Sequence, residues 1–294
     1  MGTSAIRLEH PVDLRRTVFP LVRGNGDPTT RVEGRTVTRA VRTPDGAAAL
    51  RLHQTTATEI GAEAWGPGTE HALTVTAPGL AGAFDDPEPF AAMAPAHPVI
   101  AAAWRDHRGV LLTRADPFPV LIAAILEQKV TGIEARRAWR AIVRRTSEAA
   151  PGDAGLFLPP DAERLAAIPG WELTRLGVTG RRAATLREAV RHPKKIAALT
   201  DASWLAKLPG IGPWTLGEVG RLAFGDPDAI SVGDAHLPDI VCWALAGEPR
   251  GTDERMLELL EPYRGQLGRV EVLLEASGIT PPAFGPRVEP RSFV

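Results

Sequence analysis

Cysteine is almost absent from this chain of 294 residues, with Cys242 as its single copy. One thiol excludes an intramolecular disulfide, a cysteine-ligated zinc site and a four-cysteine iron–sulfur cluster. Cys242 lies in an apolar run, which predicts a core position rather than a reactive one. The chemistry of this chain must therefore rest on other side chains.

Long apolar stretches are also missing. No run approaches the ~20 residues that a membrane-spanning helix needs, and the N-terminus lacks the successive basic, apolar and small-residue regions of a secretion signal. We therefore expect a cytoplasmic protein, associated with the nucleoid only through DNA, and no membrane partner. The length and the 44% hydrophobic content predict two folded units.

A strong net charge is missing as well, since the formal charge is −1 and the pI is near 6.7. This balance argues against a protein whose whole surface attracts nucleic acid. Basic residues are nevertheless concentrated locally: residues 97–150 carry nine Arg or Lys against five Asp or Glu, and residues 171–195 carry seven against two. In the C-terminal tail, Arg287 and Arg291 are candidates to extend this basic surface.

Two kinds of periodicity divide the chain. Strand patterns run over residues 35–43, 47–54 and 59–65, whereas helical periodicity begins after Pro98. We expect an α+β fold, with an N-terminal, mainly antiparallel β-sheet domain of residues 1–95 and an all-α domain of residues 96–294. A linker is predicted within residues 85–98. The predicted helices are 119–146, 161–168, 180–191, 201–208, 214–224, 235–245, 253–260 and about 264–276.

The sequence Leu208-Pro-Gly-Ile-Gly-Pro-Trp214 ends one helix and starts another. Pro209 cannot continue a helix, whereas Gly210 and Gly212 can adopt positive φ and leave the backbone accessible. The unpaired N–H groups of the next helix then face out of the turn, where they can bind a phosphate. A tight turn in a helical bundle is the alternative interpretation.

A glycine- and proline-bearing loop, residues 224–233, leads to Asp234 and then to a helical run. A carboxylate at the start of a helix accepts backbone N–H groups and faces the positive end of the helix, so we expect Asp234 to be ionised at neutral pH. An aspartate in this place is usually only a helix cap. The order of the hairpin, the loop and the aspartate gives it a second interpretation.

Hairpin, loop and aspartate, with twenty-four positions from Gly210 to Asp234, resemble the helix-hairpin-helix-GPD superfamily of DNA glycosylases. Residues 125–131 and 176–183 also resemble segments of this family. The resemblance implies that the hairpin grips the backbone of damaged double-stranded DNA, and that Asp234 is the catalytic residue. It also implies a possible Na⁺ or K⁺ ion at the carbonyls of Leu208 and Gly210. No cofactor is required, and a monomer suffices.

Lyase-type members of this family carry a lysine at the start of the second hairpin helix, where this chain has Trp214. Lys207 precedes the turn, so we predict a monofunctional enzyme that activates water. Trp214 and the strand-rich N-terminal unit are similar to the 3-methyladenine DNA glycosylase II type, which implies flipping and hydrolytic removal of alkylated purines. Excision of oxidised or deaminated bases, and a non-catalytic DNA-binding protein, are the alternatives.

Trp214 and Glu218 lie one helical turn apart and form the predicted base pocket, with Trp214 as its aromatic wall. The alternatives are a core tryptophan and a solvent-facing glutamate. Lys129 is predicted to fill the gap left by the flipped base or to bind phosphate, and Gln128 to contact the partner base. The remaining predicted DNA contacts are Arg181, Arg182, His236 and Arg264.

Overall fold

The first quarter of the chain forms the antiparallel sheet that its alternating residues predict. The computed structural model describes residues 1–282, so Arg287 and Arg291 lie outside the described residues. The strands are β1 (Gly2–Arg7), β2 (Thr30–Glu33), β3 (Thr36–Thr43), β4 (Gly46–Gln54) and β5 (Glu59–Trp65). Their order is β1-β5-β4-β3-β2, with every neighbouring pair antiparallel. The sequence did not predict β1, because only Ile6 is buried in it.

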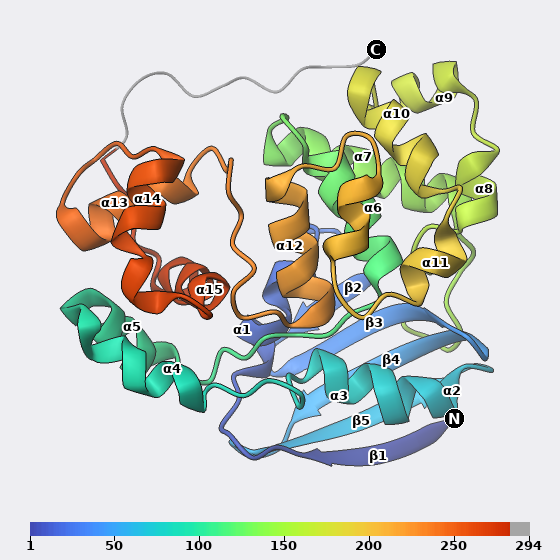
Figure 1. Cartoon of the computed structure of the whole chain (residues 1–294). Coiled ribbons are helices and arrows are strands. Elements are labelled where there is room, and N and C mark those ends of the chain that lie inside the picture. The colour runs from blue at the N-terminus through green and yellow to red at the C-terminus, as the bar shows by residue number, and fades with distance from the viewer. Residues whose placement is uncertain (283–294) are drawn as a thin grey trace.

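Helices make up most of the remaining described chain, which confirms the α+β fold class (Figure 1). Their bounds are α1 (Leu14–Val18), α2 (Thr69–His71), α3 (Ala77–Leu80), α4 (Glu88–Met93), α5 (Pro98–His107), α6 (Pro117–Glu127), α7 (Gly132–Thr146), α8 (Ala162–Ala166), α9 (Gly170–Arg175), α10 (Gly180–Ala189), α11 (Pro193–Ala197), α12 (Pro213–Phe224), α13 (Leu237–Ala246), α14 (Asp253–Leu259) and α15 (Leu267–Ser277). None of the helices in residues 1–282 is long and apolar enough to cross a membrane.

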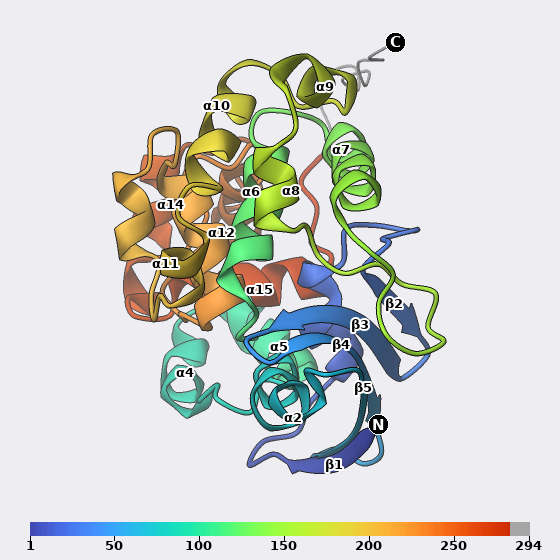
Figure 2. The same ribbon diagram turned by 90° about the vertical axis from the view of Figure 1, so that its right-hand side faces the viewer.

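Helix α6 is the centre of the larger core. Residues Phe118 to Leu126 are all buried, as expected of a helix that is apolar on every face. Both views show α6 running from the sheet up into the other helices (Figures 1 and 2). Its side chains share one hydrophobic cluster with the sheet residues Leu50 and Ile60 and with Val219 and Leu222 of α12.

The predicted single helix 119–146 is wrong, because the structure has two helices, α6 and α7. Gln128 leaves the helical conformation with ψ 118°, and Lys129 has φ 52°. Helix α7 then starts with a capping box, in which Thr131 and Glu134 satisfy each other's backbone N–H groups. The Thr-x-x-Glu spacing was the signal in the sequence for this second start.

A second, smaller core lies beside the first. The predicted linker stretch forms α4, whose Phe90 packs against Trp104 of α5 and Tyr263. These residues share a hydrophobic cluster with Val241 of α13 and Leu273 of α15. Figure 1 shows α4, α5 and α13–α15 together on the left and α6–α12 on the right. The domain boundary at residue 95 stays a prediction.

Candidate active site and hairpin

The hairpin lies between a short 3₁₀ helix, Ser203–Lys207, and α12, which begins at Pro213, one residue before the predicted helix 214–224. Gly210 has φ +88°, and a Cβ there would overlap the hydroxyl of Thr185 on α10. Gly212 is the N-cap of α12 in an extended conformation, with φ −111° and ψ −179°. The bare turn therefore brings the positive end of a twelve-residue helix to the surface.

Asp234 lies beside this hairpin and accepts three N–H groups. Its Oδ1 accepts from the backbone N–H of His236 at 2.7 Å and of Leu237 at 2.9 Å, and its Oδ2 accepts from the indole N–H of Trp214 at 3.0 Å. Helix α13 begins at Leu237, two residues later than predicted, with His236 as its N-cap. A carboxylate offers about four lone-pair directions, so one on Oδ2 stays available.

Gln128 links the end of α6 to the hairpin. Its side-chain N–H groups donate to the carbonyl of Gly210 and to the hydroxyl of Thr215, each at 3.0 Å. The structure thus brings together Gln128, the hairpin glycines, Trp214 and Asp234. The first and the last of these residues are more than a hundred positions apart in the sequence. The predicted contact of Gln128 with a partner base stays a prediction.

Lys129 occupies the tip of the turn between α6 and α7. It is exposed, and it is the one non-glycine residue with positive φ, at 52°, among residues 1–282. Lysine is disfavoured in this conformation by roughly 1 kcal/mol, so the surrounding structure must hold it there. A strained, exposed residue beside the hairpin suits the predicted insertion into DNA, which stays a prediction.

Arg182 is not available as a phosphate contact, so that prediction is wrong. Its side chain is buried, and its guanidinium donates to the carbonyls of Leu126 and Gly177, each at 2.9 Å. These bonds tie the start of α10 to the end of α6. The neighbouring Arg181 is exposed, and so is His236 beside Asp234, and their DNA contacts stay predictions.

Arg264 does not lie with the hairpin. It is exposed and paired with Glu261, and the next residue, Gly265, donates its N–H to Asp228 at 2.8 Å. Asp228 follows the C-terminal end of α12, whereas the hairpin is at the N-terminal end, about 18 Å away along a helix of this length. Arg264 thus lies far from the hairpin, and its predicted contact with DNA stays a prediction.

Glu218 is engaged by neighbouring side chains and does not face solvent freely. Its side chain is 15% exposed, its Oε1 accepts the Ser231 hydroxyl at 2.7 Å, and it pairs with Arg221. Arg221 also donates to Glu271 at 2.7 Å and lies 3.8 Å from Glu275. A base contact by Glu218 would have to use Oε2, and this role stays a prediction.

Three carboxylates therefore surround one buried guanidinium. Burial opposes the charge of Arg221, but Glu218, Glu271 and Glu275 together raise its pKa. Burial also raises the pKa of Glu271 to about 7, opposed by Arg221 and reinforced by Glu218 and Glu275. One positive charge does not compensate three negative ones, and the pKa of Glu275 is raised by burial as well. The sequence did not predict Arg221 or Glu271, because no local pattern connects residues fifty positions apart.

The raised pKa of Glu271 predicts a pH-dependent effect of Glu271→Gln on stability. The folded protein holds the Glu271 proton up to about pH 7, whereas the ordinary value is 4.5, so the wild type loses stability from this group as pH rises through that window. Glutamine does not titrate. The free energy of unfolding of the variant, relative to wild type, should rise by about 1–3 kcal/mol between pH 5 and pH 8 in urea denaturation. Equal differences at both pH values would contradict this.

Comparison by sequence finds no matching protein-family model and no matching curated protein. Comparison of structures does find matches. The 3-methyladenine DNA glycosylase from Archaeoglobus fulgidus superposes with a TM-score of 0.78 at 18% identity, covering 92% of this chain and 96% of that one. MBOgg1 in complex with a low-affinity DNA ligand superposes with a TM-score of 0.74 at 14% identity, covering 95% and 97%.

The Clostridium acetobutylicum 8-oxoguanine glycosylase/lyase is also similar, with a TM-score of 0.71 at 13% identity, covering 94% of this chain and 96% of that one. These neighbours include a 3-methyladenine DNA glycosylase and an 8-oxoguanine glycosylase/lyase. The chain thus has the fold of these DNA glycosylases along nearly its whole length. At these identities the likeness confirms the predicted fold, and function must be inferred from the site.

Proposed function

We propose that this protein is a monofunctional DNA glycosylase that flips a damaged base out of duplex DNA and hydrolyses its N-glycosidic bond. The single observation that carries the proposal is the hydrogen bond of 3.0 Å between the Trp214 indole and Asp234, beside the open N-terminal end of α12. It puts an aromatic ring, a carboxylate and a phosphate-binding helix end within one site.

The chemistry follows from these three parts. The helix end and the hairpin amides hold the DNA backbone, which anchors the strand next to the flipped nucleotide. The Trp214 ring stacks against the base. Asp234, fixed by three N–H groups, stabilises the positive charge that develops on the sugar, and its remaining lone pair orients the attacking water.

The charges near Trp214 favour a cationic base. Glu218 lies one turn from Trp214, and it belongs to the group of three carboxylates around the single guanidinium of Arg221. Alkylation of a purine at N3 or N7 gives such a cation, which is also a good leaving group. Alkylated purines such as 3-methyladenine are therefore the proposed substrates.

Oxidised bases are the second candidate, because the fold is shared with an 8-oxoguanine glycosylase/lyase. A lyase reaction needs an amine as nucleophile. The start of α12 carries Trp214, and Lys207 is exposed in the 3₁₀ helix before the turn. An oxidised base would therefore also be removed without strand cleavage.

A Na⁺ or K⁺ ion at the hairpin belongs to the same proposal. The carbonyl of Leu208 accepts one N–H, from Ile211 at 3.1 Å, and that of Gly210 accepts one, from Gln128 at 3.0 Å. A carbonyl oxygen has two lone pairs, so each keeps one for a cation. Such an ion would reinforce the grip of the hairpin on a phosphate.

The test uses end-labelled duplexes that each carry one defined lesion: 7-methylguanine, hypoxanthine or 8-oxoguanine, with an undamaged duplex as control. We expect alkali-sensitive abasic sites in the alkylated duplex, at a rate at least about tenfold above the other lesions, since one tenfold step needs only about 1.4 kcal/mol of discrimination. Strand cleavage without alkali would contradict the monofunctional mechanism. If no duplex loses a base, the protein is not a glycosylase for these lesions.

A further inference from the structure

Asp234 lies in a segment that joins the two cores. Helix α12 belongs to the larger core through Val219 and Leu222, and α13 belongs to the smaller core through Leu237 and Val241. The connecting loop, residues 225–236, crosses from one core to the other. Trp214 is on one side of this joint and Asp234 is on the other, so their distance depends on how the loop is fixed.

The loop is clamped between two helices at positions without side chains. A Cβ on Gly217 of α12 would overlap the carbonyl of Ile230, and a Cβ on Gly268 of α15 would overlap the carbonyl of Ala229. The backbone of the loop therefore touches the backbones of both helices. This close approach fixes residues 229 and 230, and hydrogen bonds fix the residues that follow.

Side-chain hydrogen bonds hold the loop next to Asp234 at two residues. Gly233 donates its N–H to Asp253 of α14 at 3.0 Å, and Ser231 bonds to two glutamates. Its N–H donates to Oε2 of Glu271 at 3.0 Å, and its hydroxyl donates to Glu218 at 2.7 Å. Its carbonyl accepts the N–H of Asp234 at 3.1 Å. Glu271 is thus two hydrogen bonds away from the backbone of Asp234.

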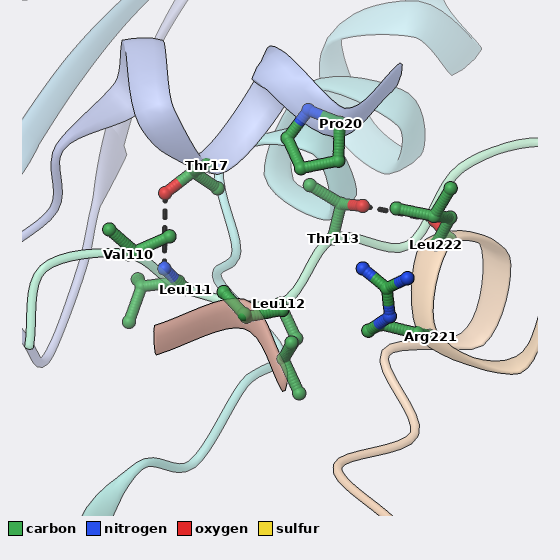
Figure 3. A pocket seen from close by; sticks show the side chains of 9 residues that line it. Thr17, Pro20, Val110, Leu111, Leu112, Thr113, Arg221 and Leu222 are labelled. Atoms are coloured by element: carbon green, nitrogen blue, oxygen red, sulfur yellow. Dashed lines mark hydrogen bonds between the residues drawn. The ribbon is translucent and has the colours of Figure 1, made fainter. Parts of the chain in front are cut away.

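Arg221 fixes Glu271 in turn. It donates to Oε1 of Glu271 at 2.7 Å, and both side chains are 3% exposed. Its other side faces a small cavity of about 10 Å³ (Figure 3). The cavity is lined mainly by apolar residues such as Leu111, Leu112 and Val272. Thr113 also lines this cavity, but its hydroxyl donates to the carbonyl of Leu222. The charged partners of Arg221 are therefore Glu218, Glu271 and Glu275.

We propose that Glu271, held by Arg221, is a positioning residue that sets the place of Asp234 relative to Trp214. The inference rests on the proposed glycosylase function and adds to it a residue thirty-seven positions from Asp234. Glu271 is 3% exposed, so its side chain is not open to a DNA strand or to the attacking water. It acts by holding the Ser231–Asp234 turn across the joint between the two cores.

The matched control is a second buried ion pair on the same helix. Arg269 of α15 pairs with Asp85, and these side chains are 1% and 3% exposed. Asp85 also accepts the N–H of Leu112, at 2.9 Å, and its side chain makes no hydrogen bond to the 225–236 loop; the backbone of its partner Arg269 donates to Pro227 of that loop at 3.0 Å. Asp85→Asn should therefore weaken the anchoring of α15 while every side-chain hydrogen bond at Ser231 stays in place.

The experiment measures single-turnover base release and duplex affinity in wild type, Glu271→Gln and Asp85→Asn, all below the unfolding transition. Glutamine has an NH₂ group in place of one carboxylate oxygen, and this group cannot accept a hydrogen bond. Residue 271 therefore loses either its bond from the Ser231 N–H or its bond from Arg221. We expect Glu271→Gln to lower the rate by about 10- to 100-fold, since a displacement of about 1 Å has that effect, with Kd within about threefold. Asp85→Asn should keep the rate within about twofold.

The decisive measurement is whether the effects of Glu271→Gln and Asp234→Asn on the rate of base release are additive. In the Asp234→Asn background, Glu271→Gln should lower the residual rate by less than about twofold, because a positioning residue has nothing left to position. Ser231→Ala, a milder variant, removes the hydroxyl's bonds to Glu218 and Arg221 but keeps the backbone bond to Glu271. It should lower the wild-type rate by about 3- to 10-fold and show the same coupling.

Four results would overturn the inference. These are a wild-type rate in Glu271→Gln, a full additional loss in the Asp234→Asn background, an equal loss in Asp85→Asn, or, if Glu271→Gln does not fold, a wild-type rate in Glu271→Asp, whose shorter side chain draws the carboxylate away from the Ser231 N–H. If the wild type releases no base from any lesion duplex, the proposed function and this inference fall together. If the wild type is active and one of the four results is found, only the inference falls.

Discussion

Replacing Asp234 by asparagine should lower the rate of base release by about 10²- to 10⁴-fold while duplex binding persists. Asparagine keeps one oxygen that can accept the N–H groups of His236 and Leu237, so the start of α13 remains capped. It removes the negative charge, and its amide group turns a donor toward the indole N–H of Trp214. Single-turnover kinetics and a binding titration on the same lesion duplex measure the two effects separately.

A second capping aspartate provides the control for this variant. Asp161 caps α8 by accepting the N–H of Arg164 at 2.9 Å, far along the chain from the hairpin. Asp161→Asn should leave both rate and affinity unchanged. If Asp234→Asn instead keeps the wild-type rate, then Asp234 serves α13 as a plain helix cap, and its catalytic role is wrong.

Gly217→Ala should strongly disrupt the loop that carries Asp234. Alanine in the middle of a helix is normally favoured over glycine by about 0.5–1 kcal/mol. Here the new Cβ would overlap the backbone carbonyl of Ile230, which no side-chain rotation can relieve. We expect a loss of about 1–3 kcal/mol in the free energy of unfolding, and a roughly 100-fold lower rate of base release because the Asp234 loop must shift.

Gly170→Ala is the matched substitution for this prediction. Gly170 begins α9, and a Cβ there meets only the side chain of Arg187, at an ordinary 3.5 Å. Denaturant unfolding and single-turnover release should leave Gly170→Ala close to wild type. A Gly217→Ala protein as stable and as fast as that control would show that α12 does not clamp the loop.

The hairpin and Asp234 were predictable from the sequence because their chemistry is local. Pro209, Gly210 and Pro213 dictate the break and the restart of the helix within six residues, whatever packs around them. Asp234 was found because it precedes an apolar helical run after a turn-forming loop. The predicted start of α13 was two residues early, since the capping side chain reaches forward to the N–H groups of His236 and Leu237.

The exposure and position of the predicted DNA-contacting arginines could not be read from the sequence. Arg181 and Arg182 are adjacent and chemically identical, yet one is exposed and the other is buried against two backbone carbonyls. Arg264 is exposed as Arg181 is, but it lies at the far end of α12 from the hairpin and pairs with Glu261. Burial and distance depend on which helix packs beside which, and single-sequence patterns do not contain that information.

The sequence by itself determined the strand-then-helix order, the bare hairpin turn and a capping carboxylate two dozen residues later, because each follows from backbone preferences of neighbouring residues. Only the tertiary structure decided that the Trp214 indole bonds to Asp234, that Gln128 braces the hairpin, and that Arg221 and Glu271 hold the loop between two cores. These contacts join residues 20 to 87 positions apart. They form only when the helices pack, because a buried charge is stable only beside a partner of opposite charge.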